Sequence, residues 1–116
     1  MSIASKLQLK EGETVRLVNA PKDLDLEMKT ASSGADAVLV FVRNQAELGK
    51  HAEVALDHAA DDRVTWIAYP KAGQLDTDLN RDTLWKLLEG KGVRPVRQVA
   101  LDDTWSALRF RPAPRS

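Results

Sequence analysis

The chain has 116 residues, 43% of them hydrophobic and 29% charged, which is enough for one domain with its own core and too little for two ordinary domains. Lys plus Arg and Asp plus Glu each number 17, and the resulting net charge of zero argues against a protein dedicated to polyanions. The absence of Cys excludes disulfides, thiolate nucleophiles and iron–sulfur clusters.

No apolar segment follows a basic start, so the pattern of a signal peptide is missing. The longest apolar run covers residues 37–42, far short of the roughly 20 residues that a membrane-spanning helix needs. We therefore expect a cytoplasmic protein without a membrane anchor, as its lack of cysteine also suggests.

The first half of the chain predicts short strands. Residues 15–18 predict a strand that ends near Pro21, because proline has no N–H to give to a sheet. Residues 24–28 alternate apolar and acidic side chains, which favours an edge strand, with a helical turn over residues 21–25 as the alternative. Residues 37–42 are apolar at every position, which is typical of a strand buried on both faces.

A helix is predicted to begin after this buried strand. Asn44 can accept a hydrogen bond from the first turn, and Glu47 three residues later completes the spacing of a capping box. An apolar stripe at helical spacing follows: Leu48, Ala52, Ala55, Leu56 and Ala59. Residues 64–69 then predict another strand, stopped by Pro70.

The second half of the chain predicts one more helix and a hairpin. Asn80 or Asp78 caps the helix, and the glycines at 90 and 92 end it with a left-handed backbone. Residues 93–101 and 105–110 predict two strands joined by a polar turn, and we expect them to pair antiparallel.

This order of elements is typical of an α/β fold. Right-handed crossovers place residues 37–42 and 64–69 side by side and parallel, with helices on the faces of the sheet. We predict a short Rossmann-like, mostly parallel sheet flanked by helices and ending in an antiparallel C-terminal hairpin. A single domain is expected over residues 1–111, with a flexible tail over residues 112–116.

Four segments carry a resemblance to known families: residues 41–44, 69–71, 80–85 and 102–112. With them the chain resembles, over nearly its whole length, a family of short bacterial proteins known as a domain of unknown function. The predicted sheet also resembles the second half of a class I methyltransferase-like Rossmann fold. The resemblance implies a small cytoplasmic α/β protein and implies no activity.

A cofactor site of that fold needs glycines in the first strand-to-helix turn, where the backbone approaches the cofactor. The corresponding residues 19–24 contain no glycine, and a phosphate loop with Gly-Lys-Ser/Thr is absent from the chain. His51 and His58 lie seven residues apart, whereas a metal pair prefers three or four and a third ligand. The sequence therefore predicts no cofactor and no metal.

Ligands of open α/β sheets bind where the carboxyl ends of the strands meet helix N-termini. The residues we expect at that place are Asn19, Arg43, Asn44, Tyr69, Lys71, Asp78, Asn80, Arg81, Asp102, Asp103 and Trp105. Lys71 and Arg81, together with two helix N-termini, favour an anionic ligand, and Trp105 offers a flat apolar wall. Helix capping, turn chemistry and core packing are the structural alternatives for the same residues.

Charge is unevenly distributed along the chain. Residues 86–116 hold seven basic and three acidic residues, whereas residues 1–85 hold ten and fourteen. Four arginines fall in the two predicted hairpin strands: Arg94, Arg97, Arg109 and Arg111. Cross-strand placement of these side chains is one way to build a basic stripe for nucleic acid. A charged sheet edge that prevents aggregation is the favoured interpretation, so nucleic acid is not an expected partner.

These observations favour a non-catalytic binding or interaction module over an enzyme. The alternative is a small enzyme, or a binder of nucleotides or small anions, that uses the crevice at the carboxyl ends of the strands. A homodimer is predicted, because residues 24–28 are too few to shield the edge of the sheet from a second copy.

Overall fold

The computed structural model describes residues 7, 9, 12–21, 30, 35–60, 63–71, 77–88, 90–101 and 103–112. These residues form five strands and two helices. In chain order the elements are β1 (Val15–Val18), β2 (Ala37–Phe41), α2 (Gln45–Ala60), β3 (Val64–Pro70), α3 (Arg81–Leu88), β4 (Val93–Ala100) and β5 (Trp105–Pro112). The predicted strand over residues 24–28 lies outside the described residues.

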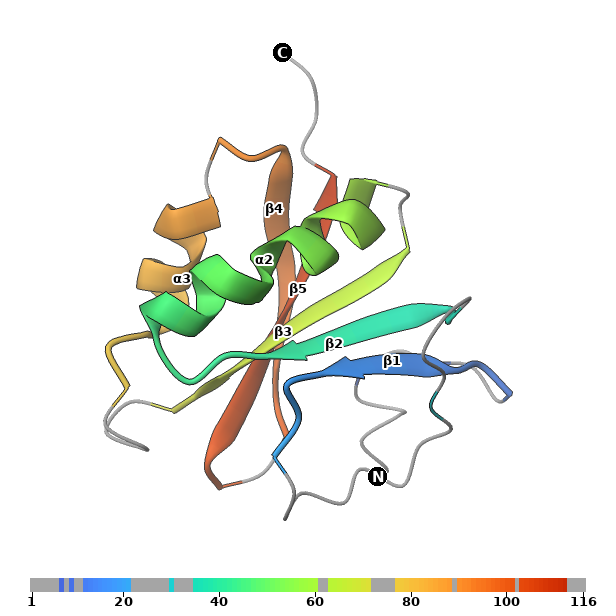
Figure 1. The fold of residues 1–116 in the computed structure, drawn as a ribbon, viewed down its shortest axis with the longest axis horizontal. Helices are drawn as coiled ribbons and strands as arrows, with labels where there is room; N and C mark the ends of the chain where they lie inside the picture. The colour runs from blue at the N-terminus through green and yellow to red at the C-terminus, as the bar shows by residue number, and fades with distance from the viewer. Residues whose placement is uncertain are drawn as a thin grey trace.

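All five strands belong to one sheet with the order β1–β2–β3–β5–β4 (Figure 1). β1 and β3 both pair with β2 in parallel, whereas β5 pairs antiparallel with β3 on one side and with β4 on the other. The predicted parallel neighbours β2 and β3 and the C-terminal hairpin are therefore confirmed. Because β5 opposes both of its neighbours, β4 runs in the same direction as β1, β2 and β3.

The prediction of a mostly parallel, Rossmann-like sheet flanked by helices is wrong. Two of the four strand pairings are antiparallel, because the chain returns after β4 into the gap between β3 and β4. Both described helices lie on the same face of the sheet (Figure 1). The crossovers through α2 and α3 advance in the same direction across the sheet, and crossovers of one hand that do so leave their helices on one face.

The face under the helices holds one layer of the core. Val38 and Val40 of β2 belong to it, with Val42 directly after the strand, and so does the apolar stripe of α2. Four small or branched side chains form that buried stripe: Leu48, Ala52, Ala55 and Ala59. α3 adds Leu84 and Leu88. Each fully buried large side chain contributes roughly 1.5–3 kcal/mol, so this layer holds the helices on the sheet.

The opposite face of the sheet holds a second layer, which includes both buried tryptophans. The Trp66 indole Nε1 donates a hydrogen bond of 3.0 Å to the carbonyl of Leu7, 59 residues earlier. The ring of Phe41 meets that of Trp105 edge to face, with centroids 5.1 Å apart and an interplanar angle of 81°. β2 is buried at all five positions, as its uniformly apolar sequence predicts.

The second strand of the hairpin is longer than predicted, whereas the first ends one residue earlier, at Ala100. β5 extends to Pro112, which pairs with Val93 of β4, so residue 112 belongs to the sheet and not to a tail. The ladder is irregular between Pro95 and Arg97, where a bulge takes Val96 out of the pairing. Neither described helix is long and apolar enough to cross a membrane.

Candidate functional site

Four strands end at one edge of the sheet, which we call the carboxyl edge. It comprises residues 19–21 after β1, 42–44 after β2, 71 after β3 and 101, 103 and 104 after β4, together with residues 77–80 before α3. The turn after β4 is tied to the end of β3 by a hydrogen bond of 2.7 Å from the Lys71 amide to the carbonyl of Thr104. The segments predicted to carry a ligand site therefore do converge.

The N-terminus of α2 lies at the carboxyl edge. Side-chain oxygens of the protein itself accept hydrogen bonds from its first backbone amides. The Asn44 Oδ1 accepts a hydrogen bond of 2.9 Å from the Glu47 amide. The Asp78 carboxylate accepts one of 2.8 Å from the Gln45 amide, and the Gln45 side chain donates to the Asp78 carbonyl at 3.2 Å. A free helix N-terminus is a ready anion site. Here a carboxylate of the chain itself occupies that position.

Glu47, in the first turn of α2, joins two segments of the carboxyl edge, the one after β1 and the one after β2. Its Oε1 accepts hydrogen bonds of 2.9 Å from the Arg43 amide and from Asn19 Nδ2. The Arg43 guanidinium binds the other oxygen, Oε2, with a closest distance of 2.8 Å. The hydrogen bonds from the Arg43 side chain lower the pKa of Glu47, against the opposing effect of burial. The same hydrogen bonds, with the negative charge of Glu47, raise the pKa of Arg43.

Asn19 forms the first turn of the carboxyl edge, where a cofactor-binding fold would have glycine. Its backbone has a φ of 60°, a left-handed conformation that asparagine tolerates better than most residues. Its side chain donates to the Phe41 carbonyl at 2.9 Å as well as to Glu47. The Asn19 amide thus bridges the ends of β1 and β2, in the place where a cofactor would have to approach the backbone.

Two predicted site residues are buried in the core. Trp105 is 5% exposed and packs against Phe41, so it offers no flat wall to a ligand. Tyr69 is 3% exposed on the helix side of β3, and its hydroxyl accepts a hydrogen bond of 3.0 Å from Gln98 Nε2 of β4. Burial raises the pKa of Tyr69, with the Arg81 charge acting against the rise and that of Asp82 adding to it.

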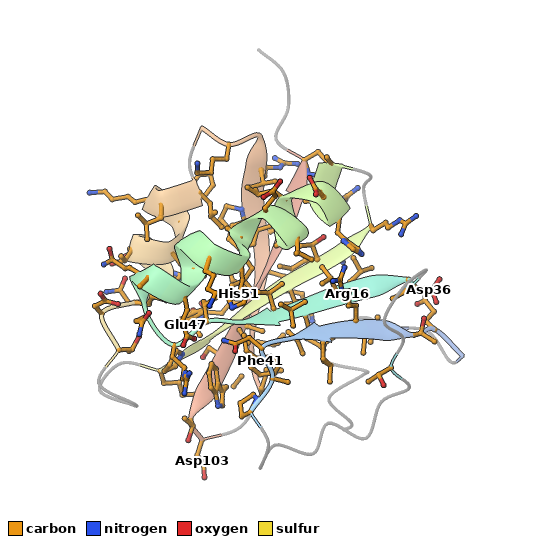
Figure 2. All side chains as sticks on the ribbon, in the orientation of Figure 1. Arg16, Asp36, Phe41, Glu47, His51 and Asp103 are labelled. Atoms are coloured by element: carbon orange, nitrogen blue, oxygen red, sulfur yellow. The ribbon has the colours of Figure 1, made fainter. Side chains whose placement is uncertain are left out.

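The remaining predicted residues divide between structural roles and solvent. Asn80 caps α3, since its Oδ1 accepts from the Thr83 amide at 2.9 Å. Arg81 forms an exposed ion pair with Asp82 at 3.5 Å. Lys71 is half-buried, and no hydrogen bond or ion pair joins its ammonium to a described residue. Asp103 is exposed at the tip of the β4–β5 turn, apart from Glu47 (Figure 2). Asp102 lies outside the described residues.

The sequence analysis did not predict the roles of three residues that form the hydrogen bonds described above: Gln45, Gln98 and Glu47. The capping-box spacing singled out Glu47 only as a partner of Asn44. The spacing of four between Arg43 and Glu47 was the available signal for their ion pair. No local signal places Asp78 on Gln45, because 33 residues separate them.

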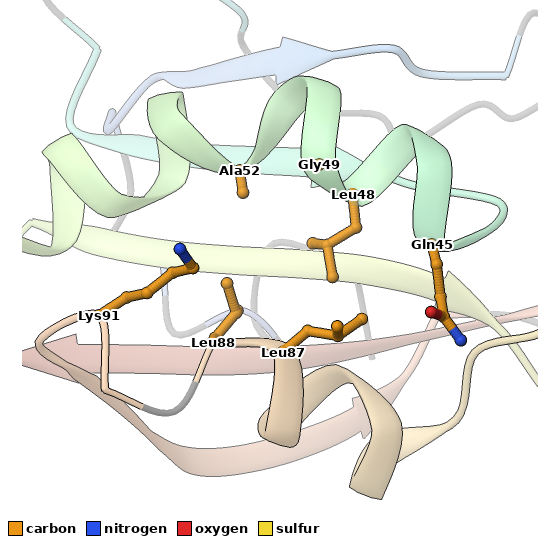
Figure 3. Close-up of a pocket in the computed structure, with 7 residues that line it drawn as sticks. All are labelled: Gln45, Leu48, Gly49, Ala52, Leu87, Leu88 and Lys91. Atoms are coloured by element: carbon orange, nitrogen blue, oxygen red, sulfur yellow. The ribbon is translucent and has the colours of Figure 1, made fainter.

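An apolar groove lies between α2 and α3, with a volume of about 180 Å³ (Figure 3). Leucines from both helices line it, and Gln45 and Lys91 lie at its two ends. Sites for drug-sized ligands usually enclose about 300–1,000 Å³, so this groove is small for such a role. Among the described residues, no group of three His, Cys, Asp or Glu side chains is placed to hold a metal ion.

Comparison of the chain with protein-family models, with curated protein sequences and with solved structures finds no match. The resemblance to bacterial proteins of unknown function stays a prediction.

Proposed function

We propose that the chain is a non-catalytic binding module that meets its partner through its surface. The observation that carries the proposal is the internal use of the polar groups at the carboxyl edge. Asp78 fills the N-terminus of α2, Glu47 neutralises Arg43, and Asn19 bridges β1 and β2. Groups that are already hydrogen-bonded must lose those bonds before they can hold a ligand, and each loss costs free energy.

The same groups argue against a cofactor of the methyltransferase or dehydrogenase kind. Such a cofactor needs a bare backbone in the first turn. Here the Asn19 side chain reaches across this turn to the Phe41 carbonyl at 2.9 Å. We therefore propose that the chain does not bind S-adenosylmethionine at this turn.

A small enzyme or a binder of anions remains the second candidate, and one observation favours it. Lys71 lies at the carboxyl edge and Arg81 directly follows its residues 77–80 as the first residue of α3, and the Arg81 side chain is 62% exposed. Two cations beside a helix start can attract a phosphate or a carboxylate. This candidate requires a ligand to displace or bypass Asp78, whose negative charge would repel it.

The proposal also includes the homodimer and the cytoplasmic location expected from the sequence. At one side of the sheet Val15 forms an isolated parallel bridge with Thr30, so β1 has a further neighbour there. The expected dimer would give a mass of about twice 12.8 kDa in light scattering at high micromolar concentration. A mass that stays at the value of one chain would rule it out.

Titration followed by amide chemical shifts tests the main proposal. Inorganic phosphate, ATP and S-adenosylmethionine at millimolar concentration should leave the amides of Arg43, Gln45 and Lys71 unshifted. The Asp78→Ala variant vacates the α2 N-terminus, so phosphate should shift its Gln45 amide, which shows that the method detects such a site. Saturable shifts of the Lys71 amide in the wild type, lost in a Lys71→Gln variant, would instead establish the second candidate.

A further inference from the structure

The apolar groove between α2 and α3 has a glycine on one of its walls. Gly49 lies within α2, where glycine is less favourable than alanine because it loses more backbone freedom on folding. Its backbone is not left-handed, and a Cβ atom placed on it would meet nothing within 4 Å. Neither backbone conformation nor internal packing therefore requires glycine at this position. The missing side chain leaves space in the groove (Figure 3).

The opposite wall of the groove exposes an apolar side chain. Leu87 of α3 is 39% exposed, and among the described residues Val96 is the other large hydrophobic residue that is exposed. Leu48 and Leu88 also line the groove, and they are buried. Removal of apolar surface from water is favourable, so an apolar occupant is stabilised by contact with Leu87.

The two ends of the groove differ in charge. Of the seven residues that line it, only Lys91 is charged, and its side chain points from the turn after α3 toward Ala52 of α2 (Figure 3). Within the described part of the chain, no hydrogen bond or ion pair holds the Lys91 ammonium. At the other end, the Asp78 carboxylate accepts a hydrogen bond of 2.8 Å from the Gln45 amide. A cation therefore lies at one end of the groove and an anion beside the other.

We infer that the groove binds a medium-chain carboxylate, with an apolar chain of about six to eight carbons. An apolar cavity of about 150 Å³ holds a benzene ring, so a groove of about 180 Å³ has room for a chain of this length. The carboxylate of the ligand lies at Lys91, which attracts it, and away from Asp78, which repels it. The apolar chain lies between Gly49 and Leu87.

A structural role explains Lys91 taken alone. A cation shortly after a helix interacts favourably with the negative end of the helix dipole, and α3 ends at Leu88. That role does not account for Gly49 or for the exposed Leu87, which line the same groove as Lys91. The inference goes beyond the proposed function, which rests on the carboxyl edge and names no ligand.

Titration with octanoate, followed by amide chemical shifts, tests the inference. We expect saturable shifts at Gly49, Leu87 and Lys91 with a Kd of roughly 1 mM. Hexanoate and butanoate should bind more weakly, by about two- to fourfold for each methylene removed. The amide of Lys71, at the carboxyl edge, should not shift. Shifts at Lys71 without shifts at Gly49 would overturn the inference and support the second candidate function.

Two variants of the groove, each with a matched control, locate the ligand. Gly49→Leu fills the groove and should weaken octanoate binding by at least about tenfold. Ala46→Leu places the same side chain on an exposed position of α2 outside the lining, and its affinity should stay within about twofold of the wild type. Lys91→Gln should weaken octanoate binding by about two- to fivefold and leave the binding of 1-octanol unchanged. Lys86→Gln, at an exposed position of α3, should bind octanoate like the wild type.

Three results would overturn the inference. The first is a wild type whose Gly49 and Lys91 amides do not shift with octanoate. The second is equal affinity of the Gly49→Leu and Ala46→Leu variants, or equal binding of octylammonium and octanoate, because the ligand would then follow apolar surface in general. The third is a mass of two chains in light scattering that falls to one chain in Gly49→Leu but not in Ala46→Leu, which would assign the groove to a second copy. Thermal unfolding checks that each variant is folded.

Discussion

At the scale of single residues, Glu47 organises the carboxyl edge. One carboxylate receives hydrogen bonds from the turn after β1, from the backbone after β2 and from the Arg43 guanidinium. Hydrogen bonds to a charged group contribute more than neutral ones, and Glu47 is held by several at once. The residue types that suggested a binding site are the same types that a folded chain needs to satisfy its own polar groups.

The Glu47→Gln variant should be less stable than the wild type by about 1–2 kcal/mol at pH 7. The pKa of Glu47 is lower in the folded chain, so its contribution is fully present above the ordinary glutamate pKa of about 4.3. The contribution is lost as the pH falls through the lowered value. Urea unfolding at pH 7 and at a series of pH values below the ordinary glutamate pKa should show a difference between the two proteins that shrinks as the pH falls.

Glu53→Gln is the matched control for this measurement. Glu53 is exposed on the same helix, and its replacement should change the stability by less than about 0.5 kcal/mol at each pH. A Glu47→Gln variant that matches the wild type at pH 7 would show that the network adds nothing to stability.

At the scale of elements, much of the fold could be predicted from local sequence. The uniformly apolar β2, the Asn44 and Asn80 caps and the hairpin all follow from short-range patterns, and the structure has them. The position of β5 between β3 and β4 could not be predicted in this way. Strand order depends on contacts between distant segments, and an antiparallel strand has the same apolar pattern in either position.

In the candidate site, too, local sequence predicted some contacts, whereas others depend on segments that lie far apart in the chain. Local capping rules predicted Asn44 and Asn80 at helix starts. They could not predict that Asp78 accepts a hydrogen bond from the amide of Gln45, which starts α2 and lies 33 residues earlier in the chain. Nor could they show that Trp105 turns into the core against Phe41, because an aromatic residue after a polar turn is compatible with either side of the sheet. Packing decides such cases, and packing is not local.

The hydrogen bond from Gln45 to Asp78 joins the starts of α2 and α3 and gives a prediction for both helices. Asp78→Ala leaves the Gln45 amide without its acceptor and removes a negative charge from the positive end of α2. We expect a loss of about 1–2 kcal/mol in thermal or urea unfolding. Asp78→Asn retains an acceptor and should lose less.

Asp103→Ala serves as the comparison for Asp78→Ala. Asp103 is an exposed residue of a turn, so its removal should change stability by less than about 0.5 kcal/mol. Equal losses for the two alanine variants would mean that the cap does not stabilise α2.

At the scale of the whole molecule, the two faces of the sheet are covered differently. Helices cover one face, whereas on the other face Trp66 is buried in a layer that includes the early residue Leu7, with Leu9 packed against it. Trp66→Phe retains an aromatic ring and deletes the donor to the Leu7 carbonyl. A buried carbonyl left without its donor costs about 1–3 kcal/mol, and we expect a loss in that range in urea unfolding.

Trp85→Phe gives the reference for this change, because Trp85 is only half-buried on α3. Its replacement should cost clearly less than that of Trp66. Equal losses would mean that ring size, and not the hydrogen bond to Leu7, determines the effect.

The outer strand β4 limits how two copies of the sheet can meet. Pro95 lacks an N–H, the bulge between Pro95 and Arg97 interrupts the ladder, and two exposed arginines add repulsion. These are the features that keep outer strands from pairing with each other. If the expected homodimer forms, we therefore expect it to use a surface other than β4.

Removal of these features should make the β4 edge associate. In a Pro95→Thr/Arg97→Thr variant the strand regains an N–H donor and loses one charge, so its free backbone groups can pair with those of a second sheet. We expect its mass in light scattering to rise with concentration between about 20 and 500 µM, above that of the wild type at each concentration. A Lys50→Thr/Lys86→Thr variant, altered on the helices, should follow the wild type. If the Pro95→Thr/Arg97→Thr variant also follows the wild type throughout, proline and charge are not what keeps this edge apart.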